Sequence, residues 1–100
     1  MSDPILPSQC SAARALIGWS QEHLANSSGV SLSTIKDFEV GRRDTALTLV
    51  IALRDTLKRA GIRFISLDKA GGPGVRLDKK EIRPYRVFSR QVKGKTQGTK

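Results

Sequence analysis

Residues 20–43 read SQEHLANSSGVSLSTIKDFEVGRR, and the spacing of residue types in this stretch predicts two short helices joined by a tight turn. Ser20 and Ser31 belong to the residue types that cap helix N-termini. They predict one helix over residues 21–27 and another over residues 32–39. Two helices joined this closely have to cross at a steep angle.

The turn between these helices requires particular residues at fixed positions. Ala25 is small where the helices approach each other, Gly29 permits the turn, and Val30 fills the corner. Ile35 and Phe38 face back toward the first of the two helices. The outward face of the second helix therefore consists of Leu32, Ser33, Lys36 and Asp37. An exposed helix of this width fits the major groove of DNA.

The flanking segments predict two more helices. One begins at Ser8 and ends at Gly18, and its apolar face is formed by Ala12, Ala13, Leu16 and Ile17. The other is capped by Asp44 or Thr45 and runs to about Arg59, and its apolar stripe consists of Ala46, Val50, Leu53, Leu57 and Ala60. Four helices around one core follow from these patterns.

The period of the apolar residues changes after Gly61. Residues 62–65 and 75–77 favour strands, and the glycines and proline of residues 68–74 favour a turn. We therefore expect a mainly α fold, in which four helices with a helix-turn-helix precede a short C-terminal β-hairpin and a basic tail. Because an isolated hairpin is marginally stable in water, it should pack on the helices or pair with another subunit.

Charge is unevenly distributed along the chain, whose formal net charge is +9. Residues 1–78 contain ten Lys/Arg and eight Asp/Glu, a net of +2, whereas residues 79–100 contain eight Lys/Arg and one Glu, a net of +7. This balance favours a polyanion as partner, either nucleic acid or an acidic membrane surface. The expected units are a flexible arm (1–7), a helix-turn-helix domain (8–60), a β-hairpin extension (61–78) and a basic, disordered tail (79–100).

Composition excludes several kinds of site. Cys10 is the only cysteine and His23 the only histidine, so the chain has neither an intrachain disulfide nor a zinc site built from Cys and His. The sequence contains no cluster of carboxylates and no pairing of nucleophile and base that would predict an enzyme. We also expect no cofactor and no metal. No apolar run approaches the roughly 18 residues of a membrane span. The N-terminus lacks the layout of a secretory signal, so we expect a cytoplasmic protein.

The stretch quoted first resembles the phage-repressor-like (Cro/cI, or XRE) family of transcriptional regulators. The resemblance covers about residues 10–60, and the residues that fall in the family's register are Gln21, Ala25, Gly29, Ile35, Glu39 and Gly41. It implies a lambda-repressor-like bundle. It also implies a partly buried ion pair between Arg14 and Glu39 that ties the first helix to the third.

The resemblance further implies roles at a DNA interface. The positions that match base-contacting residues are Leu32, Ser33, Lys36 and Asp37. The positions that we assign to phosphate contacts are Gln21, Ser31, Thr34, Arg42 and Arg43. Gln21 lies at the start of its helix, where free N–H groups and the helix dipole favour anions.

Four residues depart from the family's pattern. Leu32 stands where a polar base reader is common, and it could instead contact a thymine methyl group. Asp37 brings a negative charge toward DNA, where it could accept from cytosine N4 or orient Lys36. Asp44 and Thr45 replace a common proline. The base sequence that is read stays open.

The sequence therefore predicts a small transcriptional regulator, a repressor, that binds double-stranded DNA with residues 31–39 in the major groove. Because one helix reads only a few base pairs, we expect a homodimer with half-sites about 34–36 Å apart. Its interface would be the fourth helix, the hairpin, or both. The alternative is an antitoxin or antiactivator that acts mainly through a protein partner. The tail could be a DNA-binding arm, a partner-binding segment or a solvated end.

Overall fold

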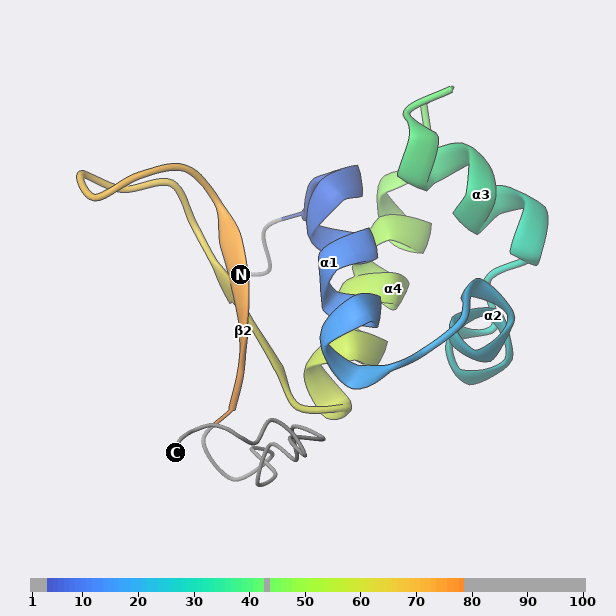
Figure 1. Cartoon of the computed structure of the whole chain (residues 1–100). Coiled ribbons are helices and arrows are strands. Elements are labelled where there is room, and N and C mark those ends of the chain that lie inside the picture. The colour runs from blue at the N-terminus through green and yellow to red at the C-terminus, as the bar shows by residue number, and fades with distance from the viewer. Residues whose placement is uncertain (1–3, 43, 79–100) are drawn as a thin grey trace, which may run out of the picture.

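The computed structural model describes residues 4–42 and 44–78, and it shows four helices followed by a β-hairpin (Figure 1). The order of elements is α1 (Pro7–Ile17), α2 (Gln21–Ser28), α3 (Leu32–Val40), α4 (Leu47–Arg59), β1 (Ile62–Ile65) and β2 (Gly74–Leu77). The mainly α fold with a C-terminal hairpin is confirmed. The predicted tail, residues 79–100, lies outside the described residues.

The helix-turn-helix forms as its caps predict. The Ser20 hydroxyl accepts a hydrogen bond from the backbone N–H of His23 at 2.9 Å, and α2 ends at Gly29, whose φ is 79°. The Ser31 hydroxyl accepts from the backbone N–H of Thr34 at 3.2 Å. Only residues that tolerate the left-handed region end a helix in this way, and glycine does so without a steric cost.

The predicted apolar face of α1 is only partly right. Ala13 is fully buried and Ile17 packs against the core, but Ala12 and Leu16 are exposed. The helix begins earlier than predicted because Pro7 occupies its first turn and the Gln9 carbonyl Oε1 accepts from the Leu6 backbone N–H at 2.8 Å. The buried face is thereby completed by Gln9 and Cys10.

The predicted cap of α4 is wrong. Neither Asp44 nor Thr45 caps the helix, because the N-cap position is Ala46, whose side chain has no oxygen to offer. Ala46 has non-helical dihedral angles of φ −54° and ψ 136°, so the helix starts after it and its side chain is exposed rather than part of the apolar stripe. The remaining stripe is confirmed at Val50, Leu53 and Leu57, all buried.

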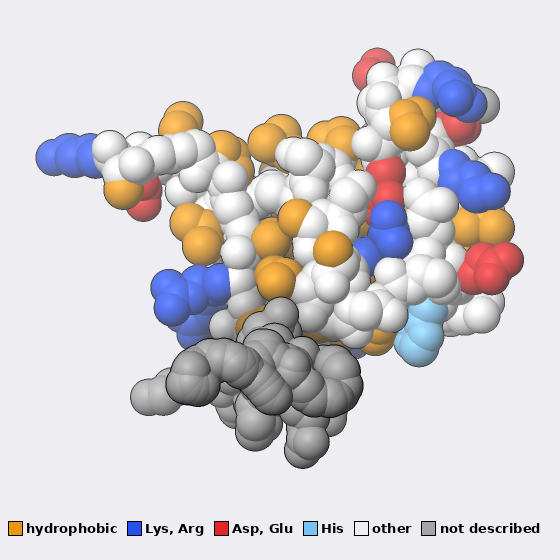
Figure 2. Space-filling view, in the orientation of Figure 1, with side chains coloured by type: hydrophobic (Ala, Val, Ile, Leu, Met, Phe, Trp, Pro, Cys, Tyr) orange, Lys and Arg blue, Asp and Glu red, His pale blue; other side chains and the backbone are white. Residues whose placement is uncertain are grey.

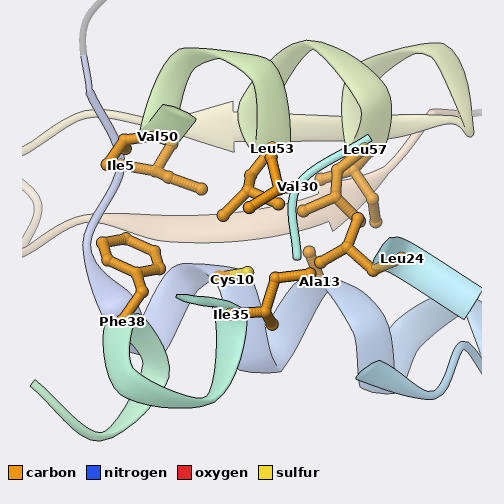
Figure 3. Packing of buried hydrophobic residues seen from close by; sticks show 11 residues of the cluster. Ile5, Cys10, Ala13, Leu24, Val30, Ile35, Phe38, Val50, Leu53 and Leu57 are labelled. Atoms are coloured by element: carbon orange, nitrogen blue, oxygen red, sulfur yellow. The ribbon is translucent and has the colours of Figure 1, made fainter. Parts of the chain in front are cut away.

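One core joins the helices and the hairpin (Figure 3). Side chains from all four helices point toward one another between α4 on one side and α1 with α3 on the other. The buried members are Ile5, Cys10, Ala13, Leu24, Val30, Ile35, Phe38, Val50, Leu53, Leu57 and Ile62. Ile5 was expected to lie in a flexible arm, but it packs into this core with 6% of its surface exposed.

The hairpin packs against the side of the bundle that faces away from α3 (Figure 1). Its strands are antiparallel, with Ile62 opposite Leu77 and Phe64 opposite Val75. These four residues share one face, because directly opposed residues of an antiparallel pair point to the same side. β2 contacts α1 and β1 contacts α4, so the hairpin leans on the helices as the sequence predicts. None of the helices within residues 4–42 and 44–78 is long and apolar enough to cross a membrane.

Candidate nucleic-acid interface

Helix α3 presents the predicted outward face. Ile35 and Phe38 anchor its other side in the core, with 0% and 7% of their surfaces exposed. Ser33 and Lys36 are exposed, whereas Leu32 and Asp37 are half-buried. Of the four predicted base-contacting residues, two are therefore exposed on the same helix face and the other two are partly covered.

The N-terminus of α3 carries a small hydroxyl cluster. The Ser31 hydroxyl lies 2.7 Å from the hydroxyl of Thr34 and 3.4 Å from that of Ser33. Ser31 is exposed and Thr34 half-buried, so the two predicted phosphate-contacting residues are tied to each other at the end of the helix. Hydroxyls held this way can donate to a phosphate oxygen without losing the cap that starts the helix.

The Asp37 carboxylate contacts Arg42, just beyond the end of α3. The Arg42 guanidinium Nη1 lies 3.4 Å from the Asp37 carboxylate, and the Arg42 backbone N–H donates to the Asp37 carbonyl at 3.0 Å. The Arg42 side chain is 70% exposed. This contact offsets the negative charge that Asp37 brings toward DNA and leaves most of the guanidinium accessible. Arg43 lies outside the described residues.

The predicted ion pair between Arg14 and Glu39 is present and close. Arg14 Nε and Nη2 donate to the two Glu39 carboxylate oxygens at 2.8 and 2.7 Å, which makes the pair bidentate. The Glu39 side chain is only 4% exposed. Arg14 Nη1 also donates to the Trp19 carbonyl at 3.0 Å. The pair therefore links α1, the segment before α2, and the C-terminal half of α3.

Glu39 has two further partners that the sequence analysis did not predict. Gln21 Nε2 donates to Glu39 Oε1 at 3.0 Å, and the Cys10 thiol also hydrogen-bonds to the carboxylate. Burial by itself raises the pKa of Glu39, but the hydrogen bonds from Arg14, Cys10 and Gln21 outweigh it and hold that pKa below its ordinary value. Burial raises the pKa of the Cys10 thiol, and the hydrogen bond to Glu39 raises it further, so the thiol keeps its proton.

The contact with Glu39 changes the expected role of Gln21. Its side-chain amide is directed to Glu39 and thereby fixes the start of α2 relative to the end of α3. A phosphate contact by Gln21 stays a prediction, and it would use the backbone N–H at the helix start or the remaining amide hydrogen. Sequence spacing gave no signal for this contact because Gln21 and Glu39 are 18 residues apart.

The surface around α3 carries charges of both signs. Figure 2 shows Lys and Arg side chains (blue) over α3 and beyond its C-terminal end, with acidic side chains (red) among them. Within residues 4–42 and 44–78, no group of three His, Cys, Asp or Glu side chains is placed to hold a metal ion.

Comparison with known proteins agrees with this geometry. A family model described as "Helix-turn-helix" matches residues 11–60, half of the chain. The match covers all of α2, α3 and α4 and residues 11–17 of α1, and it stops before the hairpin. No curated protein sequence matches the chain.

Proposed function

The chain belongs to the Cro/cI-type (XRE-like) family of helix-turn-helix, sequence-specific DNA-binding regulators, and from this premise we propose that it is a homodimeric repressor whose helix α3 reads the major groove. The observation that carries the proposal is the exposed pair Ser33 and Lys36 on a helix whose opposite side is anchored by Ile35 and Phe38. A rigidly held helix can place two side chains at base edges with a fixed register.

In this proposal the predicted residues divide into those that contact bases and those that contact phosphates. Lys36 and Ser33 contact base edges, and Leu32 and Asp37 contact the bases at the margins of the same face. Ser31, Thr34 and Gln21, at the starts of α3 and α2, contact phosphates, as do Arg42 and Arg43. Phosphate contacts fix the position of the protein, whereas base contacts give sequence preference. Bound over a promoter, such a dimer represses by blocking access to it.

The test separates base contacts from phosphate contacts. Lys36→Ala and Arg42→Ala are compared on a duplex selected from a random library and on a scrambled duplex, by fluorescence anisotropy. We expect Lys36→Ala to weaken binding to the selected duplex by about 1–3 kcal/mol and to have little effect on the scrambled one. Arg42→Ala should weaken binding to both duplexes alike.

Lys58→Ala is the matched control, because Lys58 is an exposed lysine at the far end of α4, beside the hairpin. It removes the same charge without touching α3, and binding should barely change. If Lys36→Ala retained the full preference for the selected duplex, or if the wild-type chain had no preference, α3 would not be the element that reads sequence. Tight binding to an acidic protein, unchanged by Lys36→Ala, would instead favour the antitoxin or antiactivator.

A further inference from the structure

An apolar surface crosses three elements at one end of the molecule. Two open hollows lie there and share Leu6: one, under the hairpin, includes Leu67 and Pro73, and the other, between α1 and the end of α3, includes Ala12 and Val40. We call these five residues the Leu6 strip. In Figure 2 hydrophobic side chains (orange) are distributed along the upper edge of the molecule, from the hairpin to the C-terminal end of α3.

Three large hydrophobic side chains of the Leu6 strip are exposed to solvent. Leu6, Val40 and Leu67 are 47%, 65% and 72% exposed, and they are among the large hydrophobic side chains most accessible in the described chain. Single exposed leucines are normal on protein surfaces, but side chains that line adjoining hollows mark a contact site.

The few charged side chains that line the hollows of the Leu6 strip are paired with other side chains. Two charged residues line its hollows, Arg54 and Glu39. Arg54 is 14% exposed and lies 2.8 Å from the Asp55 carboxylate, and Glu39 is 4% exposed and bound to Arg14. At the tip of the hairpin Asp68 and Lys69 have opposite charges. The charged side chains that line the two hollows are therefore both paired within one copy, so the contacts that these hollows offer to a second copy are mainly apolar.

On the other face of the hairpin, cationic side chains lie close to one another. Arg63 and Arg76 are directly opposed across the strands, and like charges in that position repel each other. Lys58 and Arg54 line the same hollow as Arg63, with Asp78 the acidic side chain among them. Arg54 and Arg63 are paired with Asp55 and Asp78, at 2.8 and 3.3 Å, but two copies that met through this face would still bring Arg76 and Lys58 of each copy together.

We infer that a second copy of this chain binds the Leu6 strip, with Leu67 of each copy seated against Leu6, Ala12 and Val40 of the other. A two-fold arrangement uses the same patch on both copies, and the strip supplies both a projecting side chain and a hollow. The hairpin tip is shaped for this task, because the Asp68 carboxylate accepts from the backbone N–H groups of Ala70 and Gly71 at 2.8 and 3.2 Å and so fixes the turn.

The position of the strip suits a dimer on DNA. Its Val40 end is followed directly by Gly41 and Arg42, so a copy docked there stands beside α3. A copy docked behind the hairpin would stand on the side away from α3 (Figure 1). This inference rests on the proposed function only because both require a homodimer. The experiments below test the dimer contact separately from the reading of sequence by α3.

The first experiment measures self-association of the full chain by sedimentation velocity over a wide concentration range. Leu67→Asp and Leu6→Asp should each weaken dimerisation by about tenfold or more, because a charge replaces an apolar contact. Both variants should fold. Leu67 is largely exposed, and position 6 is the N-cap of α1, where Asp is a favoured residue. Circular dichroism verifies that each variant is folded. Leu16→Glu adds a like charge at an exposed leucine in the C-terminal half of α1 and should dimerise as the wild type does.

The second experiment locates the contact. Copies carrying Leu67→Cys are mixed with copies carrying Val40→Cys and treated with a short thiol-specific cross-linker. We expect a cross-linked heterodimer, and none when Leu16→Cys replaces Val40→Cys, since Cys10 is buried and does not react. A monomeric wild type, or dimers that tolerate both aspartates, would overturn the inference. Neither result touches the reading of sequence by α3, which Lys36→Ala tests separately.

Discussion

At the scale of single residues, Glu39 matters most for how the DNA-facing helix is held. Its carboxylate accepts from Arg14 in α1 and from Gln21 in α2, although Glu39 itself belongs to α3. A buried carboxylate without a partner is costly, so these contacts make the relative positions of the three helices interdependent. None of the three residues needs to touch DNA to affect DNA binding.

Removing only the cation should destabilise the fold strongly. Arg14→Met leaves the Glu39 carboxylate buried without its guanidinium, and we expect the free energy of unfolding to fall by about 3 kcal/mol. The double variant Arg14→Met with Glu39→Met should lose less than Arg14→Met alone, because no buried charge remains. Urea unfolding of the wild type, of Arg14→Met, of Glu39→Met and of the double variant measures this coupling. Additive losses would mean that the pair is not coupled in the folded chain.

Glu39 also predicts how stability depends on pH. Its pKa in the folded chain lies below the ordinary value of 4.5, so the ionised form stabilises the fold above that value. This contribution is lost as the pH falls from 4.5 through the lower pKa of the folded chain. In Glu39→Gln this part of the dependence should be absent, so its free energy of unfolding should approach that of the wild type as the solution becomes acidic. A difference between the two proteins that stays constant on acidification would contradict it.

At the scale of elements, some helix ends could be predicted from the sequence and others could not. Ser20, Ser31 and Gly29 act within one turn of their helix, so their roles are legible from local spacing. Asp44 and Thr45 have suitable side chains but the wrong positions, because Ala46 keeps non-helical dihedral angles. The hydrogen bonds from Gln9 to the hairpin and from Gln21 to Glu39 depend on how elements pack, and the spacing of residue types carries no signal for them.

The start of α4 offers room for stabilisation. Ala46 occupies the N-cap without a side-chain hydrogen bond, and it is exposed. Ala46→Asp places a carboxylate where it can accept from a free N–H of the first turn, and we expect the free energy of unfolding to rise by about 0.5–2 kcal/mol. Ala15→Asp, at an exposed position within α1, introduces the same charge without a cap and should give no such gain. Thermal unfolding of the two variants decides between them.

Gln9 holds the hairpin against α1. Its Nε2 donates to the carbonyls of Ile65 and Gly74 at 3.3 and 3.0 Å, just where the strands leave the body of the protein. In Gln9→Met these two hydrogen bonds are lost together with the one from the Leu6 backbone N–H to Gln9 Oε1, and we expect local opening of β1 and β2 to become easier by about 1–3 kcal/mol. Hydrogen exchange should show faster exchange in the hairpin and unchanged exchange in α2 and α3. Ser8→Ala, an exposed neighbour on α1, is the control, and uniform acceleration would mean that the hairpin does not open on its own.

At the scale of the whole molecule, the distribution of charge separates two contributions to DNA binding. Residues 1–78 carry a net charge of +2, although they include α3 and every predicted base-contacting residue, whereas residues 79–100 carry +7. Nonspecific attraction grows with the number of phosphates that are neutralised, but sequence preference depends on base contacts. We therefore expect most of the preference to come from the first segment and much of the salt-dependent affinity from the second.

Truncation to residues 1–78 tests this division, because the core and the hairpin end before the cut. The slope of log affinity against log salt concentration should become shallower by about 0.9 for each phosphate contact that is lost. Affinity should fall by the same factor on the selected and the scrambled duplex, so that their ratio is kept. A changed ratio would instead assign sequence reading to the tail, and an unchanged slope would show that residues 79–100 make no phosphate contacts. In the expected case, α3 selects the site and the tail sets how tightly that site is held at a given salt concentration.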